Sequence, residues 1–280
     1  MYKLGETTSP ELVASLSARL WKAKIPHQVV SKEGEDSESL SEVWLVREAD
    51  LPLAVEILNS PESNKASNQG GKSPLVASLG YAKVTWFFLI TCLLVAALTG
   101  LGSNINYLPW FTIVPMELRG GDLDAGTLEG ALAAGEFWRL FTPALIHLGG
   151  LHLVFNLLWV WEFGRRIEVI DGRLRLFMLI LASAIIANLA QYYSGSILFG
   201  GMSGVIYALL GYMVVFDKLS PAPKYQLPTG IVVFMLVWLA LGFTQFTEAL
   251  GMGRIGNAAH SAGLASGVGI ALFARLLFRS

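Results

Sequence analysis

The sequence predicts an all-α polytopic membrane protein: a bundle of six transmembrane helices with a small N-terminal α+β domain on the cytosolic side. Three observations support this fold class. The 280 residues are 54% hydrophobic and only 15% charged, which is too apolar for an ordinary soluble domain. Of the 41 Asp, Glu, Lys and Arg residues, 19 lie in the first 75 positions, so the polar part is N-terminal. The rest contains apolar runs of the length that crosses a bilayer.

The overall composition also excludes several classes of function. The net charge is −1, so there is no bulk electrostatic basis for binding nucleic acid. A single cysteine, Cys92, excludes an internal disulfide and a cysteine-rich metal site, and we expect it to pack in the interior. The first ten residues, MYKLGETTSP, lack an apolar core, so no cleavable signal peptide is expected.

Residues 1–60 are predicted to form the cytosolic α+β domain, in the order βαββα. Ser9 is a plausible N-cap and Pro10 suits the first turn of the first helix. His27 is interpreted as a surface or strand-edge residue. The predicted strands are 2–4, 27–32 and 42–48, and the predicted helices are 9–24 and 50–60. The order favours two helices packed on an antiparallel sheet. Residues 61–82 form a polar linker, and 83–280 form the membrane domain.

Six apolar segments are candidate spanning helices. They are 84–103, 151–168, 174–193, 203–216, 229–247 and 258–276. The fourth is short. The long connection 104–150 is rich in aromatic residues, which favour the membrane interface, and we expect it to lie partly in one leaflet. Its aromatic residues include Trp110, Phe111, Phe137, Trp138 and Phe141.

The basic residues predict the orientation. Most lie before the first segment, between the second and third, after the fourth, and at the end of the sixth. Connections rich in Lys and Arg stay in the cytoplasm. Both termini are therefore predicted to be cytoplasmic.

Polar side chains of three predicted helices lie at one depth. Ser203, His152 and His260 each lie roughly 20 Å along their helix from the charged cytoplasmic end, at about 1.5 Å per residue. In a hydrocarbon core of about 30 Å, that level lies about 10 Å below the outer face. Polar groups inside a membrane are costly and usually functional. The convergence therefore predicts a site.

Within this site we expect Ser203 to be the nucleophile and His260 the general base. The glycine-rich loop before Ser203 descends into the membrane, and the start of a helix supplies free N–H groups for an oxyanion. A desolvated histidine stays neutral, as a general base requires. Small residues on the fourth and sixth helices allow close approach. These are Gly204, Ala208 and Gly211 opposite Ala259, Gly263 and Gly267.

Three further residues complete the predicted chemistry. Tyr207, one turn after Ser203, is expected to pack on the imidazole of His260. His152 and Asn156 are four residues apart on one helix face, and both can donate hydrogen bonds to a tetrahedral oxyanion. The aspartates after residue 125 are Asp171 and Asp217, both near the cytoplasmic face. The prediction is therefore a Ser–His dyad.

Each motif also has a simpler interpretation. GMSG, with Gly201 and Gly204 around Ser203, is common in helix packing, and Val205 breaks the G-x-S-x-G pattern. The small residues of the sixth helix also serve packing. His147 is interpreted as a loop residue, and Arg139 and Glu168 as anchors of a loop and a helix end. A zinc site from His147, His152 and His260 is conceivable, but H-E-x-x-H is absent, so we predict neither metal nor cofactor.

Four motifs resemble the rhomboid intramembrane serine proteases over nearly all of 84–276. They are GMSG followed by Tyr207, AHSAGLASG, HLGGLHLVFN and FWRLFT, and they occur in the family's order. The resemblance implies six helices, a dyad of Ser203 and His260, and an oxyanion site of His152 and Asn156. It further implies hydrolysis within transmembrane segments of other proteins in a bacterial inner membrane, with a small residue at the cut. The fifth helix, with Trp238, and the loop 248–256 would then form the substrate gate and cap.

The other class of function is a non-proteolytic membrane protein, either a binder of transmembrane helices or a carrier. A binder that had lost activity should lack Ser203 or His260, and both are present. A carrier should show inverted repeats and charged residues at the midplane, and neither is visible. The oligomeric state, the substrate and the purpose of the N-terminal domain stay open.

Overall fold

The computed structural model describes residues 1–23, 25–33, 39–60, 82–119, 122–219, 225, 227–244 and 256–277. The chain forms two compact units, Met1–Ala82 and Lys83–Ser280, which are described separately. The predicted linker, 61–82, lies outside the described residues except for Ala82. The predicted cap loop, 248–256, lies outside them except for Gly256.

The first unit has the predicted order of elements. Its elements are β1 (Tyr2–Thr7), α1 (Pro10–Lys22), β2 (His27–Glu33), β3 (Ser39–Leu45), a 3-10 turn (Glu48–Asp50) and α2 (Leu51–Asn59). The sheet order is β1-β3-β2, and both pairs are antiparallel. β3 begins and ends three residues earlier than predicted, because pairing with β2 extends to Glu33 opposite Ser39. Cross-strand pairing, and not hydrophobicity, sets its ends.

A small apolar core holds the helices against the sheet. The Ser9 side chain accepts a hydrogen bond from the Leu12 N–H at 3.3 Å and Pro10 opens α1, as predicted. The buried core residues come from both helices, β3 and the turn before β2 and are Leu20, Ile25, Val43, Leu45 and Ala54.

His27 is not a surface residue, and that part of its prediction is wrong. It lies on the edge strand β2, but only 5% of it is exposed. Its Nδ1 donates to the Ile25 carbonyl at 2.9 Å, and its Nε2 lies 2.7 Å from Ser17 Oγ. The Trp21 ring lies 4.8 Å away. His27 is paired with the buried Leu45, so the strand alternation turns it towards the helices.

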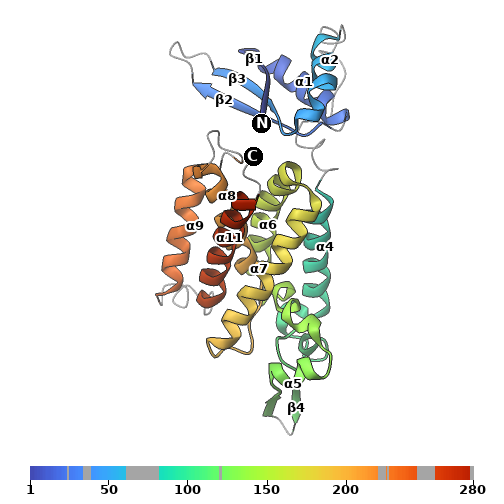
Figure 1. The fold of residues 1–280 in the computed structure, drawn as a ribbon. Helices are drawn as coiled ribbons and strands as arrows, with labels where there is room; N and C mark the ends of the chain where they lie inside the picture. The colour runs from blue at the N-terminus through green and yellow to red at the C-terminus, as the bar shows by residue number, and fades with distance from the viewer. Residues whose placement is uncertain are drawn as a thin grey trace. The chain divides into compact units, whose positions relative to one another are not determined.

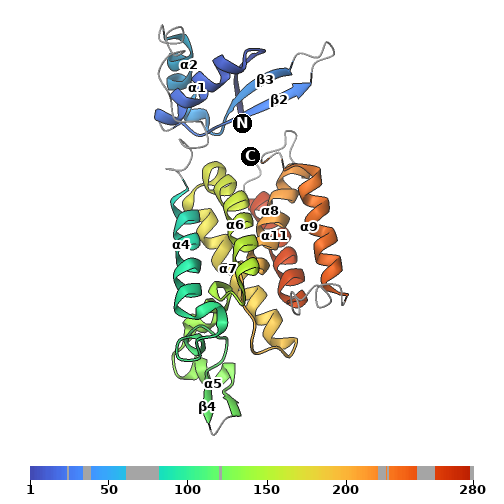
Figure 2. The ribbon, with the colours of Figure 1, turned by 180° about the vertical axis from the view of Figure 1, so that it is seen from behind.

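Within the described residues of the second unit, six helices overlap the six predicted segments. They are α4 (Lys83–Leu98), α6 (Gly150–Asp171), α7 (Arg173–Tyr193), α8 (Ser203–Leu219), α9 (Thr229–Gly242) and α11 (Asn257–Leu277). However, α4 and α9 each end five residues earlier than predicted. Figures 1 and 2 show α8 and α11 in the middle of this unit and α4 and α9 at opposite edges. Among the described residues, α7 alone is long and apolar enough to cross a bilayer by length and composition, while α4 and α9 are apolar but shorter.

The contact between α8 and α11 forms the centre of this unit. All residues from Gly204 to Met213 of α8 are buried. A Cβ atom added at Gly263 would lie 2.0 Å from the Gly204 carbonyl oxygen, and one at Gly267 would lie 1.9 Å from that of Ala208. Two backbones therefore touch directly, which confirms the packing predicted for the small residues.

The connection between α4 and α6 is more structured than predicted. It contains the hairpin of β4 (Met116–Arg119) and β5 (Asp122–Ala125), the short helix α5 (Leu128–Ala133), and several 3-10 turns. Two of these turns, Phe137–Leu140 and Thr142–Leu145, lead into α6. Short turns and a two-stranded pairing leave little hydrophobic periodicity to detect.

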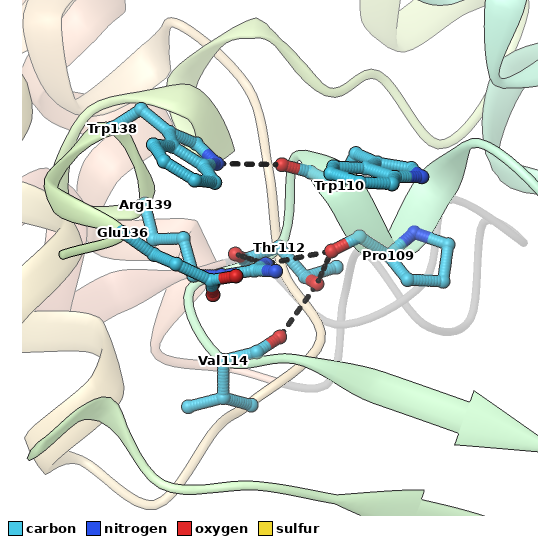
Figure 3. Close-up of polar contacts among 7 residues, drawn as sticks. All are labelled: Pro109, Trp110, Thr112, Val114, Glu136, Trp138 and Arg139. Atoms are coloured by element: carbon cyan, nitrogen blue, oxygen red, sulfur yellow. Dashed lines mark hydrogen bonds and ion pairs between the residues drawn. The ribbon is translucent and has the colours of Figure 1, made fainter. Parts of the chain in front are cut away.

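Arg139 holds this connection together (Figure 3). Its Nη1 donates to the carbonyl oxygens of Pro109 at 2.6 Å and Thr112 at 2.9 Å, and its Nε pairs with Glu136 at 2.6 Å. Trp138 Nε1 donates to the Trp110 carbonyl at 3.2 Å. Arg139 is buried, and its bonds confirm the predicted anchoring role.

Glu168 also acts as an anchor, but of α4. Its carboxylate accepts hydrogen bonds from the N–H groups of Val84 and Thr85 at 2.9 and 2.8 Å, and from the Thr85 hydroxyl at 2.9 Å. The first N–H groups of a helix have no partner within it. Glu168 thereby caps the start of α4 from the end of α6.

We expect the stability of the first unit to fall with acid because of His27. Burial lowers the pKa of His27 from its ordinary value of 6.5, and the smaller effect of the bond to Ile25 opposes this. The folded unit therefore binds this proton more weakly than the unfolded chain does. The contribution of His27 to stability is fully present above pH 6.5. As the pH falls below 6.5, the free energy of unfolding decreases by up to about 1.4 kcal/mol per pH unit. Urea unfolding of fragment 1–60 at pH 7.5 and 5.5, followed by the fluorescence of Trp21 and Trp44, measures the effect.

The control for this experiment is His27→Gln, which cannot titrate. Its free energy of unfolding should change little across this pH window. An equal loss in the variant and in the wild-type fragment would contradict the assignment to His27.

Candidate active site

The loop before Ser203 is pressed between two other elements. Gly201 has a φ of +115° and donates its N–H to the Pro143 carbonyl at 3.1 Å. A Cβ atom at Gly200 would lie 2.5 Å from Ile146 Cβ, and one at Gly201 would lie 2.6 Å from His152 Nε2. Glycine is required at both positions for this approach. The loop thus carries the chain to the start of α8, where Ser203 is the first residue.

Ser203 and His260 are in hydrogen-bond contact. His260 Nε2 lies 2.7 Å from Ser203 Oγ, although the two residues are 57 positions apart. Ser203 is half-buried and His260 is 5% exposed. This distance is the one that proton transfer from a hydroxyl to an imidazole requires. The structure therefore brings together the predicted nucleophile and base.

Tyr207 lies against the imidazole, as predicted. The two ring centroids are 4.9 Å apart and the planes are inclined at 40°. The Tyr207 hydroxyl donates to the Met235 carbonyl of α9 at 2.9 Å. The sequence did not predict this second contact, because backbone carbonyl partners leave no mark in a residue pattern.

His152 and Asn156 lie beside the loop that precedes Ser203. A Cβ atom at Gly201 would lie 2.6 Å from His152 Nε2 and 3.8 Å from Asn156 Nδ2. Asn156 Nδ2 donates to the His152 carbonyl at 2.7 Å, so one N–H of the amide is committed to its own helix. An asparagine amide has two such donors, and no bond from the second is seen to any described residue. Asn156 Oδ1 is buried without a hydrogen-bond partner among the described residues.

The acidic residues of the helices serve other purposes. Asp217 accepts the N–H groups of Tyr225 and Leu227 at 2.6 and 2.8 Å, ahead of α9. Asp171 accepts the Tyr212 hydroxyl at 3.0 Å. His260 Nδ1 has no hydrogen-bond partner in the part of the chain that the structure describes. No described acidic group therefore completes a triad.

His147 lies in the loop before α6, as predicted, with its ring next to that of His152. It is buried, its Nδ1 donates to the Leu145 carbonyl at 3.1 Å, and its ring lies 5.2 Å from that of His152. In the described ranges, no three His, Cys, Asp or Glu side chains are grouped so that they could hold a metal ion.

A comparison with protein families identifies the fold to which this geometry belongs. Residues 134–276 match the model of the rhomboid domain, which covers just over half of the chain. The chain belongs to the rhomboid family. Rhomboid proteins are integral membrane proteins, and the family implies intramembrane serine protease activity. The matched region of this rhomboid protein contains Ser203, His260, His152 and Asn156, and leaves out the first unit and α4.

We expect Asn156→Ala to keep the fold and to lower kcat. A donor that acts mainly on the transition state typically contributes about 10²–10³ in kcat. His152→Ala should be at least as harmful, because its ring lies closer to Gly201. Cleavage of a labelled transmembrane substrate in proteoliposomes measures the effect, with circular dichroism to monitor folding.

The matched control is Asn188→Ala in α7. Asn188 is as buried as Asn156, but its amide donates to the carbonyl oxygens of Leu140 and Phe141 at 2.9 and 3.3 Å. The loss of this amide should lower the melting temperature and leave kcat close to the wild-type value. Unchanged cleavage by a folded His152→Ala/Asn156→Ala double variant would remove both residues from the mechanism.

Proposed function

We propose that this rhomboid protein is an intramembrane serine endopeptidase that hydrolyses peptide bonds in or near transmembrane segments of other membrane proteins. Ser203 is the nucleophile and His260 the general base. The observation that carries the proposal is the 2.7 Å contact between Ser203 Oγ and His260 Nε2, within a region that matches the rhomboid family.

The reaction proceeds in two steps on these residues. Ser203 Oγ attacks the scissile carbonyl carbon while His260 Nε2 takes the hydroxyl proton. The oxyanion that forms is stabilised by the Ser203 N–H, His152 and Asn156. When the C–N bond breaks, His260 returns the proton to the leaving amine. Water then attacks the acyl-enzyme with His260 again as base, which releases the acid and restores Ser203.

The setting follows from the helices and the charges. In this proposal the six helices of Lys83–Ser280 cross the bilayer with both termini in the cytoplasm, as in a bacterial inner membrane. The connection between α4 and α6 lies at the opposite interface. Its exposed Trp110 and Phe137, at 61% and 65%, suit the headgroup region. The partners are lipid and transmembrane substrates.

Labelling with a fluorophosphonate tests the dyad. An activated serine attacks phosphorus, so the probe should modify Ser203 in the wild-type protein, and Ser203→Ala should neither react nor cleave. His260→Ala should abolish labelling, because an unassisted hydroxyl is a poor nucleophile near neutral pH. Mass spectrometry of the labelled peptide identifies the modified residue.

Ser261→Ala is the matched control, since Ser261 is the exposed neighbour of His260. It should be labelled and active like the wild type. Chelators should leave cleavage unchanged. A Ser203→Ala protein that still cuts, or a wild-type protein silenced by chelator and rescued by zinc, would refute the dyad.

The membrane domain should work without the first unit. We expect a fragment that begins near Leu75 to insert and to cleave a model substrate in detergent. It retains Lys83, where α4 begins, and the cap that Glu168 provides. The measurement is the cleavage rate relative to the full chain at equal amounts of folded protein.

The control is the same fragment with Ser203→Ala, which should be inactive. A folded fragment that has lost all activity would show that the first unit makes an essential contact with the site.

A further inference from the structure

The start of α11 depends on a side chain from another helix. The first N–H groups of a helix have no carbonyl partner within it. In α11 the backbone bonds begin at His260, whose N–H donates to the Gly256 carbonyl at 3.0 Å. The preceding N–H, of Ala259, donates to Gln191 Oε1 of α7 at 3.1 Å. Gln191 therefore satisfies the N–H group next to His260.

Gln191 is built into this position. It is 8% exposed, and a Cβ atom at Gly256 would lie only 3.1 Å from its Oε1. Gly256 thus leaves the room through which the amide reaches Ala259. A buried bond to a backbone N–H is costly to lose, because the donor is left unsatisfied.

The same face of α7 also contacts the helix of the nucleophile. Ala187, four residues before Gln191, lies on that face. A Cβ atom at Gly204 would lie 2.6 Å from Ala187 Cβ. One turn of α7 therefore touches Gly204, which adjoins Ser203, and Ala259, which adjoins His260.

We propose that Gln191 is a positioning residue for His260, and that α7 is the common reference that sets the distance between His260 and Ser203. This inference rests on the proposed function of the two residues. Gln191 itself touches neither the nucleophile nor the substrate in this scheme. Gln191 holds the first turn of α11 in place, so that His260 Nε2 stays within proton-transfer distance of Ser203 Oγ.

Two substitutions separate the acceptor atom from the volume of the side chain. Gln191→Met keeps the length without the oxygen, and Gln191→Glu keeps an oxygen acceptor. A misplacement of about 1 Å can reduce a rate by 10²-fold. We expect Gln191→Met to slow fluorophosphonate labelling of Ser203 by roughly tenfold to a hundredfold, and to lower kcat with KM unchanged. Gln191→Glu should restore the wild-type labelling rate to within a few fold.

Ser183→Ala is the control for the loss of a buried polar group from α7. The Ser183 hydroxyl lies within hydrogen-bond distance of two carbonyls of its own helix, Leu179 and Ile180, at 2.6 and 3.2 Å. This variant should be labelled at the wild-type rate. If Gln191→Met does not fold in detergent, Gln191→Asn withdraws the acceptor by one methylene and should show the same slow labelling.

A second readout does not require activity. Amide exchange in 257–260, followed by mass spectrometry, should accelerate in Gln191→Met and stay at the wild-type rate in Gln191→Glu. The inference is overturned if Gln191→Met is labelled at the wild-type rate, if Gln191→Glu is as slow as Gln191→Met, or if Ser183→Ala is equally slow. A wild-type protein that is not labelled at Ser203 refutes the dyad instead, and the exchange data then show whether Gln191 still anchors α11.

Discussion

The direct backbone contact between α8 and α11 is the constraint on which the rest of the membrane unit depends. Gly263 and Gly267 face the carbonyl oxygens of Gly204 and Ala208 at distances that leave no room for a Cβ atom. Because the backbones meet, Ser203 and His260 can approach to 2.7 Å from separate helices. A methyl group at either glycine would force α8 and α11 apart, and would act on the contact between Ser203 and His260 only through that separation.

The polar residues of this unit differ in how completely they are paired. Arg139, Glu168 and Asp217 each bind at least two backbone groups, and each holds a loop or a helix start in place. His260 and Asn156, in contrast, each keep one buried polar atom without a partner among the described residues. Unpaired buried groups are costly in a folded protein. Buried atoms without such a partner also occur on Thr142, His147, Arg165 and Asn257, so this property is not confined to the proposed site.

The site is assembled from four helices, and each contributes in a different way. α8 supplies Ser203, the proposed nucleophile, at its first residue, where free N–H groups are available. α11 supplies His260, the proposed base, and α6 places His152 and Asn156 beside Gly201. α7 contributes no reacting group in the proposed mechanism, but it contacts the chain next to both members of the dyad through Ala187 and Gln191. Rigid elements of this kind hold reacting atoms more accurately than loops do.

The sequence by itself determined the positions of the six helices, the small residues that join α8 to α11, and the residues expected to react. These follow from local patterns: apolar length, glycine spacing, and polar side chains at one depth. Only the tertiary structure decided the burial of His27, the hairpin between α4 and α6, and the partners of Tyr207 and Gln191. Each of these depends on pairing between distant segments or on a bond to a backbone carbonyl or N–H group. Every residue carries those backbone groups, so no residue pattern marks which of them a side chain will bind.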